Sequence, residues 1–186
     1  MPGSVLHDSV TLQHFASAGR LDVLEVRHGW LPLPRWCESV HDEIHRSPQI
    51  AHCQAVIQAT WLGGPEEVSS DAELDEVTRI MIALGSAVGA AVDDGEATKH
   101  EGEAESIVIA KRTDDAKFLT DDNDAFSVAT THLTAQRVKD TVDVLEDAVA
   151  MGEITAQDAA GICASIRQHG RHLRRVRPDP MPASHF

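Results

Sequence analysis

Two neighbouring stretches decide the fold, GEAESIVIA at residues 102–110 and FLTDD at residues 118–122. In the first, apolar residues from Ala104 to Ile109 cover most of a helix surface, which predicts a buried helix. A carboxylate in the first turn of such a helix has to be paired, hydrogen-bonded or bound to a metal ion. The second stretch belongs to a short strand at residues 117–119 that ends on Thr-Asp-Asp, where a new helix begins. Acids at the start of a helix and at the carboxyl end of a strand are typical of the mouth of a parallel sheet.

Length and composition predict one acidic globular domain. The chain has 186 residues, enough for a single core, and we assign residues 1–177 to the domain and residues 178–186, with three prolines, to a disordered tail. Thirty acidic and sixteen basic residues give a formal net charge of −14, which argues against non-specific nucleic-acid binding over the whole surface. Three scattered cysteines indicate no disulfide framework. Without an apolar run of about 18 residues or a signal peptide, a cytoplasmic protein with no membrane partner is predicted.

Short apolar runs alternate with helical patterns along the chain. We expect strands at residues 4–7, 30–33 and 117–119 that lie side by side and parallel, and an edge strand at residues 129–133. Thr134 is then expected to cap a long helix. This alternation predicts an α/β fold with a short-stranded, mostly parallel central sheet.

A set of acidic residues falls where strands end, where helices begin or at the edge of an apolar helix face. These candidates are Asp8, Glu43, Glu105, Asp121 and Asp122. Any one of them alone would more often be a solvated or helix-capping charge. Several carboxylates at one sheet edge repel one another, and divalent cations relieve that repulsion. Hard oxygen ligands favour Mg²⁺ or Mn²⁺ over zinc.

Four blocks of sequence, in order, carry a resemblance to a known family. DSVTL at residues 8–12, followed by GRLDVL at 19–24, resembles the opening of PIN-domain nucleases. LPRW at 33–36 and VHDEI at 40–44 resemble the next segment. GEAESI at 102–107 is similar to the Gly-Glu-Ala-Glu-Ala-Ile motif of one branch, the predicted bacterial nucleic-acid-binding proteins, and LTDD at 119–122 is similar to its last acidic segment.

The resemblance implies a three-layer α/β/α sandwich with a helical C-terminal part, and a Mg²⁺- or Mn²⁺-dependent endoribonuclease. By position, the catalytic and metal-binding tetrad would be Asp8, Glu43, Glu105 and Asp122. Asp121 would be an alternate metal ligand, with Ser9 and Thr120 in support. RNA would be the substrate. The resemblance also admits a toxin of a toxin–antitoxin pair, with an antitoxin or other protein partner, and a homodimer. The competing interpretation is a catalytically degenerate PIN-like module that binds a protein.

Three further patterns complete the candidates. Arg167, Arg171, Arg174 and Arg175 form a basic cluster, which is either a charged helix end or a phosphate-binding tail. His41 and His45 share a helix face at a spacing that could hold a transition metal, although a solvated face explains them as well. Within the first stretch, we expect Glu105 to point at the site, and we expect Glu103 to be more exposed and replaceable.

Overall fold

The computed structural model describes residues 3–46, 50–88 and 100–175. The predicted tail at residues 178–186 therefore lies outside the described residues. In chain order the strands and helices are β1 (Val5–His7), α1 (Ser9–Ser17), α2 (Leu21–His28), α3 (Glu38–His45), α4 (Ala51–Ile57), α5 (Asp71–Val88), α6 (Glu101–Arg112), β2 (Lys117–Leu119), α7 (Asn123–His132), β3 (Val138–Lys139), α8 (Thr141–Ala150) and α9 (Ala156–Gln168). Short 3-10 helices lie at Thr60–Leu62 and Ala135–Arg137.

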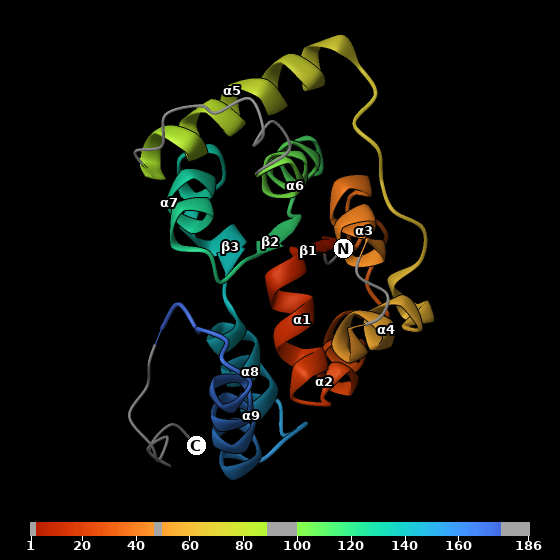
Figure 1. Cartoon of the computed structure of the whole chain (residues 1–186), viewed down its shortest axis with the longest axis vertical. Coiled ribbons are helices and arrows are strands. Elements are labelled where there is room, and N and C mark those ends of the chain that lie inside the picture. The colour runs from red at the N-terminus through yellow and green to blue at the C-terminus, as the bar shows by residue number, and fades with distance from the viewer. Residues whose placement is uncertain (1–2, 47–49, 89–99, 176–186) are drawn as a thin grey trace.

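The three strands form one parallel sheet in the order β1-β2-β3 (Figure 1). Leu6 lies opposite Phe118, and Phe118 lies opposite Val138. These three side chains are almost completely buried. The predicted α/β class, the parallel direction and the strands near residues 5–7 and 117–119 are confirmed.

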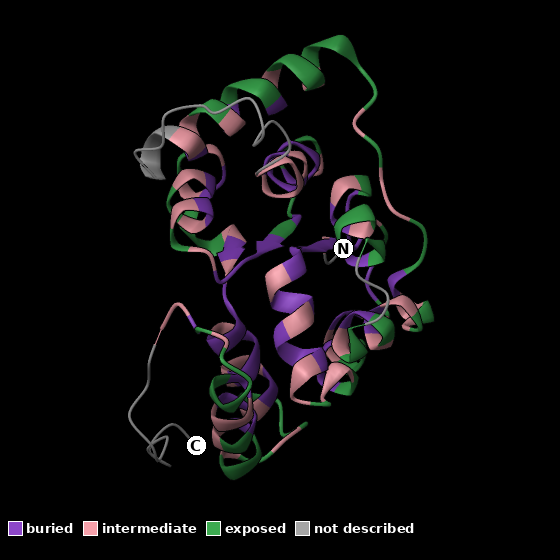
Figure 2. Ribbon diagram, viewed as in Figure 1, coloured by how far each residue is buried: buried purple, intermediate pink, exposed green. Residues whose placement is uncertain are grey.

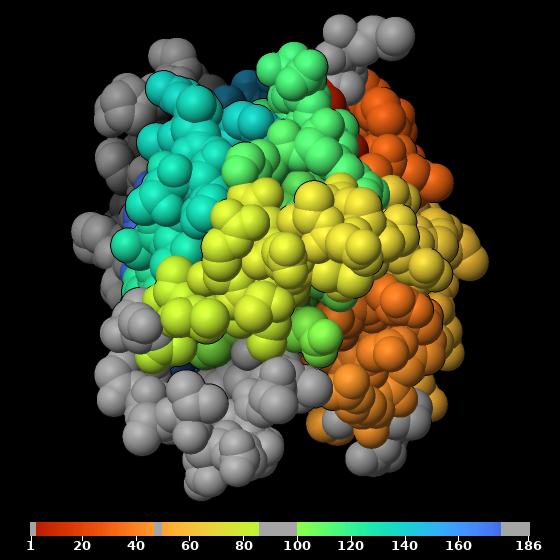
Figure 3. All heavy atoms as spheres, turned by 90° about the horizontal axis from the view of Figure 1, so that it is seen from above, coloured from red at the N-terminus to blue at the C-terminus, as the bar shows by residue number. Residues whose placement is uncertain are grey.

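Helices lie on both sides of this small sheet (Figure 1). α6 packs against β1 and β2, α7 packs against β3, and α5 lies across α6 and α7 (Figure 3). On the other side, α1 lies next to α2, α4 and α9, and α8 packs on α9. Buried residues follow the strands and the helix faces turned toward them (Figure 2). Among the described residues, no helix is long and apolar enough to cross a membrane.

α6 is the buried helix that the sequence predicts. Six of the seven residues from Ala104 to Ala110 are buried, all except Glu105. Its first turn approaches α3 closely, because a Cβ atom on Gly102 would lie 2.9 Å from a methyl group of Val40. Only glycine permits this distance without displacing Val40. The close approach fixes which glutamates of α6 face α3 and which face the sheet edge.

The strand predicted at residues 30–33 is wrong, since this segment is a loop. The guanidinium of Arg35, which is 7% exposed, donates hydrogen bonds to four carbonyl oxygens: those of His28 (3.1 Å), Gly29 (2.6 Å), Leu31 (2.5 Å) and Trp61 (2.5 Å). These bonds fold the segment around the Arg35 side chain. The carbonyl groups of the segment are therefore not free to pair with a neighbouring strand. The backbone meets β1 through a single bond, from the His7 N–H to the Arg35 carbonyl (2.9 Å).

The predicted edge strand at residues 129–133 and the long helix after Thr134 are also wrong. Residues 129–132 end α7, and the third strand is Val138–Lys139, which the sequence reading placed inside a helix. Arg137 explains the difference. Its side chain donates to the carbonyls of Ala116 (2.7 Å) and Thr113 (3.0 Å), which lie just before β2. The following residues are thereby held beside β2 as a strand, and α8 starts only after Asp140.

Arg35 provides a test of the first correction. We expect Arg35→Met to lower the free energy of unfolding by about 3–5 kcal/mol, because four carbonyls lose a charged donor. Arg35→Lys should also lose stability, since an ammonium group cannot reach four acceptors in a fork. Urea denaturation measures the change, and Arg167→Met, on the exposed surface of α9, is the control. Wild-type stability in both Arg35 variants would show that other contacts hold the loop.

Candidate functional site

Each of the three strands is followed by a buried aspartate. Asp8 directly follows β1, Asp121 comes two residues after β2, and Asp140 directly follows β3. Their exposed fractions are 2%, 5% and 0%. Because the strands are parallel, the three carboxylates lie along the same edge of the sheet. Three buried carboxylates in one row need compensation, and the described residues provide it for two of them.

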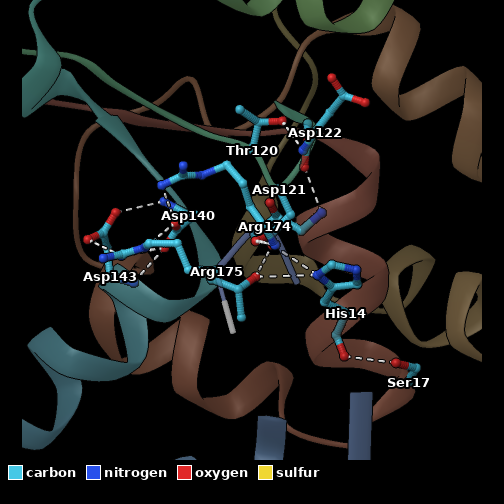
Figure 4. A network of polar contacts seen from close by, with 12 residues as sticks. His14, Ser17, Thr120, Asp121, Asp122, Asp140, Asp143, Arg174 and Arg175 are labelled. Atoms are coloured by element: carbon cyan, nitrogen blue, oxygen red, sulfur yellow. Dashed lines mark hydrogen bonds and ion pairs between the residues drawn. The ribbon is translucent and has the colours of Figure 1, made fainter. Parts of the chain in front are cut away.

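Asp140 is compensated by two arginines from the segment after α9 (Figure 4). Arg175 donates to both of its oxygens (2.6 and 2.7 Å), and Arg174 donates to Oδ2 (2.6 Å). Asp140 also caps α8 in a reciprocal pair with Asp143. Burial alone would raise the pKa of Asp140, but the bonds from Arg175 and the Asp143 N–H reverse the effect and lower it. This carboxylate is therefore ionised and fully engaged within the fold.

Asp121 is compensated by neighbours from three elements (Figure 4). Its Oδ2 is 2.9 Å from Nδ1 of His14 on α1 and accepts a hydrogen bond from the Thr141 hydroxyl. Its Oδ1 accepts from the Arg174 N–H at 3.3 Å. The side chain of Asp121 is 0% exposed. Asp121, predicted as an alternate metal ligand, thus lies inside a buried polar network in which both of its carboxylate oxygens have hydrogen-bond partners.

Asp8 is the aspartate without a cationic partner. Its Oδ1 caps α1 by accepting from the Thr11 N–H (2.6 Å), whereas its buried Oδ2 has no hydrogen-bond partner among the described residues. Burial raises the pKa of Asp8 from 3.8 to about 7, although the hydroxyl of Thr120 and the Thr11 N–H favour the ionised form. The charge of Glu103 raises this pKa further.

Glu103 is the second carboxylate with a raised pKa, and the sequence analysis predicted it to be exposed and replaceable. Burial raises its pKa from 4.5 to about 7, with further contributions from the charges of Glu43 and Asp122. Its side chain is 22% exposed. Glu103 and Glu43 line a pocket of about 280 Å³ together with Ser9 and His100. Glu103 therefore interacts electrostatically with Asp8, Glu43 and Asp122.

Glu105 does not join this group, which corrects the expectation that it points at the sheet edge. Its carboxylate accepts a hydrogen bond from the Ser39 N–H (3.1 Å) and so caps the first turn of α3. Residues two apart on a helix point about 200° apart, so only one of Glu103 and Glu105 can face the sheet edge. The close packing of Gly102 against α3 turns Glu105 toward α3 and Glu103 toward Asp8.

The remaining acids and supporting residues lie around the same edge. Glu43 is exposed on α3. Asp122 caps α7 by accepting from the Ala125 N–H (2.7 Å). The buried hydroxyl of Thr120 accepts from the Asp122 N–H (3.1 Å), and Ser9 is buried at the start of α1.

His100 is a further site residue that the sequence reading did not single out. Its side chain is 11% exposed and its Nδ1 lies 3.9 Å from a carboxylate oxygen of Glu103. Neither of its ring nitrogens has a hydrogen-bond partner within the described ranges. The backbone of His100 has a positive φ of 69° directly before α6. Nothing in the local sequence pattern distinguishes this histidine from the other ten in the chain.

The arginine cluster does not present a free phosphate-binding tail. Arg174 and Arg175 are engaged by Asp140, and Arg174 also lies over the ring of Phe126 at 3.7 Å. Arg171 donates to the side chain of Gln13 and contacts His52 at 2.8 Å. Of the four candidates, Arg167 alone is exposed. The cluster therefore joins the C-terminal segment to the sheet edge and to α1.

His41 and His45 stack on each other with ring centroids 3.9 Å apart. Each uses Nδ1 locally, with the Asp42 carboxylate at 3.1 Å from His41 and the His41 carbonyl at 2.8 Å from His45. In the part of the chain that the structure describes, no three His, Cys, Asp or Glu side chains are placed to hold a metal ion. Neither the pair His41 and His45 nor the group Asp8, Glu43, Glu103 and Asp122, which we call the acidic edge, therefore forms a complete set of metal ligands within the described residues.

The chemistry of the acidic edge nevertheless fits a hard divalent cation. Asp8 offers an oxygen without a hydrogen-bond partner, and Glu103 offers a carboxylate whose charge is disfavoured by its surroundings. A cation with oxygen ligands would stabilise both charged forms. No family model, curated protein or solved structure matches the chain. The geometry alone therefore supports the functional argument.

The raised pKa values predict how stability depends on pH. Folded Asp8 keeps its proton up to about pH 7, whereas the unfolded chain loses it near its ordinary value of 3.8. The native state binds more protons in this window, so its stability falls as the pH rises from about 4 to 7. Asp8→Asn keeps the helix cap and removes this penalty. We expect it to stabilise the metal-free protein at pH 8 by about 2–4 kcal/mol.

Denaturant titrations from pH 4 to 8 measure this effect. Glu103→Gln should act in the same direction and over the same window, because its pKa is also raised to about 7. Asp22→Asn, at an exposed position of α2, is the control that should leave the pH profile unchanged. If Asp8→Asn follows the wild-type profile, its carboxyl group is not buried without compensation.

Proposed function

We propose that the chain is a divalent-metal-dependent ribonuclease with a PIN-like sandwich architecture, and that its site is the acidic edge around Asp8 and Glu103. One observation carries the proposal. Of the three aspartates that follow the strands, Asp8 alone has no basic side chain as a partner among the described residues and keeps a buried oxygen without a hydrogen bond. A buried carboxylate without compensation lowers the stability of the fold, and a bound cation would be the simplest compensation.

Mg²⁺ or Mn²⁺ would be held by Asp8 and Glu103, with Glu43 and Asp122 as the other acidic residues at the site. When bound, such an ion lowers the pKa of a water molecule and neutralises charge on the phosphodiester. The substrate would be RNA, and the fold provides no nucleophilic cysteine for a covalent route. Cys37 is buried beside Ser106, and burial raises the pKa of its thiol to about 12.

The side chains around the acids have positioning roles in this proposal. The Thr11 N–H fixes Oδ1 of Asp8, which leaves Oδ2 for a ligand. Thr120 accepts from the Asp122 N–H and holds the turn between β2 and α7. His100 lies next to Glu103, with Nδ1 3.9 Å from its carboxylate. Glu103, whose pKa burial raises to about 7, would bind or release a proton near neutral pH, which suits acid–base steps.

An RNA substrate has to overcome the net charge of −14. The charges of the acidic edge would be reduced by the bound cation, but the surrounding surface would still repel a long polyanion. The proposal also includes a cytoplasmic location, which the sequence predicts, and an antitoxin or other protein partner and a homodimer, which the resemblance implies. A partner that contributes basic residues would suit this surface best.

The second candidate is a PIN-like module that binds a protein and has lost catalysis. The observation in its favour is that, within the described ranges, no three ligand groups are already placed to hold a metal ion. Under this interpretation Asp8 is a helix cap whose second oxygen has no function. The two candidates differ in how the purified protein responds to a divalent cation.

Mn²⁺ should raise the melting temperature if the acidic edge binds it. At a free concentration one hundred times the dissociation constant, binding to the native state alone adds about 2.7 kcal/mol. Thermal unfolding with 0–10 mM Mn²⁺, and with Ca²⁺ for comparison, measures the shift. Asp8→Asn should abolish it, whereas Asp22→Asn should keep it. A melting temperature that does not respond to Mn²⁺ would favour the interaction module.

The two glutamates of α6 provide a matched pair for activity. We expect Glu103→Gln to reduce Mn²⁺-dependent cleavage of labelled single-stranded RNA by at least one hundredfold, because it removes a charged ligand. Glu105→Gln should keep most of the activity, since glutamine still accepts from the Ser39 N–H. Equal activity in both variants, or cleavage that persists in EDTA, would contradict the proposed mechanism.

A further inference from the structure

The face of the sheet opposite α6 and α7 borders a second pocket, distinct from the acidic edge. Its volume is about 950 Å³, which is within the range of small-molecule sites. β1, β2 and β3 contribute to it together with α2 and α8, and so does the loop that begins at Gly29. The residues that carry the argument are Arg27, His28, Trp30, Lys117 and Lys139. The proposed ribonuclease chemistry uses none of them.

Two lysines in the lining of this pocket are the groups that would bind an anion. Lys117 begins β2 and Lys139 ends β3, and both line the pocket. In the described part of the chain, neither forms an ion pair, whereas Arg27 is engaged by Glu153 at 3.2 Å and by Asp147 at 3.9 Å. Unpaired lysines are unexpected in a chain with nearly twice as many acidic as basic residues. They provide two ammonium groups for an anionic ligand.

His28 adds a hydrogen-bond acceptor to the pocket, because the hydrogen bonds of its neighbours determine which ring nitrogen carries the proton. Nδ1 of His7 lies 2.9 Å from the Arg35 carbonyl, which can only accept, so His7 carries its proton on Nδ1. Nε2 of His7 must then accept from Nδ1 of His28, 3.0 Å away. Nε2 of His28 is left without a proton. Burial lowers the pKa of His7 to about 4 and that of His28 to about 2, so both are neutral at pH 7.

Trp30 supplies an aromatic surface at the same pocket. Its side chain is unusually exposed for tryptophan, at 68%, in the loop that Arg35 holds in place. Trp36 is 5% exposed by comparison. An exposed indole in the same pocket as two lysines provides a surface on which a planar ring can stack and two charges for an anionic substituent of that ring.

Acidic residues in the lining restrict the ligand further. Asp114, Asp115 and Asp147 also border the pocket, against Arg27, Lys117, Arg137 and Lys139. The lining is therefore close to neutral, and the anionic charge of a ligand must be concentrated at the two lysines. Its other end must offer N–H or O–H donors to the aspartates and to Nε2 of His28. A long polyanion would meet the acidic surface outside the pocket.

We propose that this pocket binds a mononucleotide, with its phosphate at Lys117 and Lys139 and its base on Trp30. A nucleoside monophosphate combines a compact anion, a planar ring and hydroxyl or amino donors within the available volume. Nε2 of His28 accepts from one of those donors. The site does not depend on the proposed ribonuclease activity, because it shares no residue with the acidic edge.

The test is a calorimetric titration of the full chain with AMP in EDTA, which removes metal-dependent binding at the acidic edge. We expect one AMP per chain, quenching of tryptophan fluorescence, and weaker binding of adenosine and of inorganic phosphate. Lys117→Ala and Lys139→Ala should each weaken binding at least tenfold. Trp30→Ala should weaken AMP binding and abolish the quenching. Lys111→Ala, which removes an exposed lysine outside the pocket that pairs with Glu76, should bind AMP as the wild type does.

Circular dichroism of each variant verifies the fold, and Asp8→Asn should bind AMP normally. No AMP, GMP or UMP binding at millimolar concentration would overturn the proposal. So would unchanged binding in Lys117→Ala and Lys139→Ala, which would place the nucleotide elsewhere. Inorganic phosphate binding as tightly as AMP would show an anion site without base recognition. Tighter binding of a single-stranded RNA oligomer through the same lysines would replace the mononucleotide by a polynucleotide.

Discussion

The row of buried aspartates at the carboxyl edge of the sheet is the constraint on which the rest of the structure depends. A buried carboxylate without a partner costs several kcal/mol, and a domain of this size has a net stability of only about 5–15 kcal/mol. Asp140 and Asp121 have partners from distant parts of the chain. Asp8 does not, and its raised pKa corresponds to about 4 kcal/mol against the charged form. Among the described residues, the fold therefore compensates two of the three carboxylates and leaves Asp8 without compensation.

The same constraint explains why the C-terminal segment and α1 lie where they do. Arg174 and Arg175 bring the chain after α9 back across the sheet edge to Asp140, and Leu173 beside them is buried in the core. His14 lies on α1, one turn after the residues that Asp8 caps, so one short helix serves two aspartates. Three of the four arginines that the sequence suggests for phosphate binding, Arg171, Arg174 and Arg175, are therefore part of the structural framework.

Local sequence patterns correctly predicted those strands and helices that are determined by local interactions. The strands at residues 5–7 and 117–119 and the buried helix α6 follow from apolar runs and their period. The loop at residues 30–33 and the strand at Val138–Lys139 depend on Arg35 and Arg137, each of which captures carbonyls distant in sequence. No pattern in a single sequence reports such a contact. Asp8, Asp121 and Asp122 were predicted from strand ends, whereas Asp140 was missed because β3 was predicted to be part of a helix. Choosing between Glu103 and Glu105 required the packing of α6 on α3, which Gly102 permits.

The carboxyl edge of the sheet and the sheet face opposite α6 and α7 carry different charged groups. Acids gather at the carboxyl edge, whereas Lys117 and Lys139 face the opposite sheet surface. Three residues of extended chain span about 10 Å, comparable to the Debye length at moderate ionic strength, and the protein interior screens less than water. An anion at the lysines would therefore raise the pKa of Asp8 further, and it would attract a cation bound at Asp8. Because such coupling is reciprocal, a nucleotide in the lysine-lined pocket and a metal ion at the acidic edge would each favour the binding of the other.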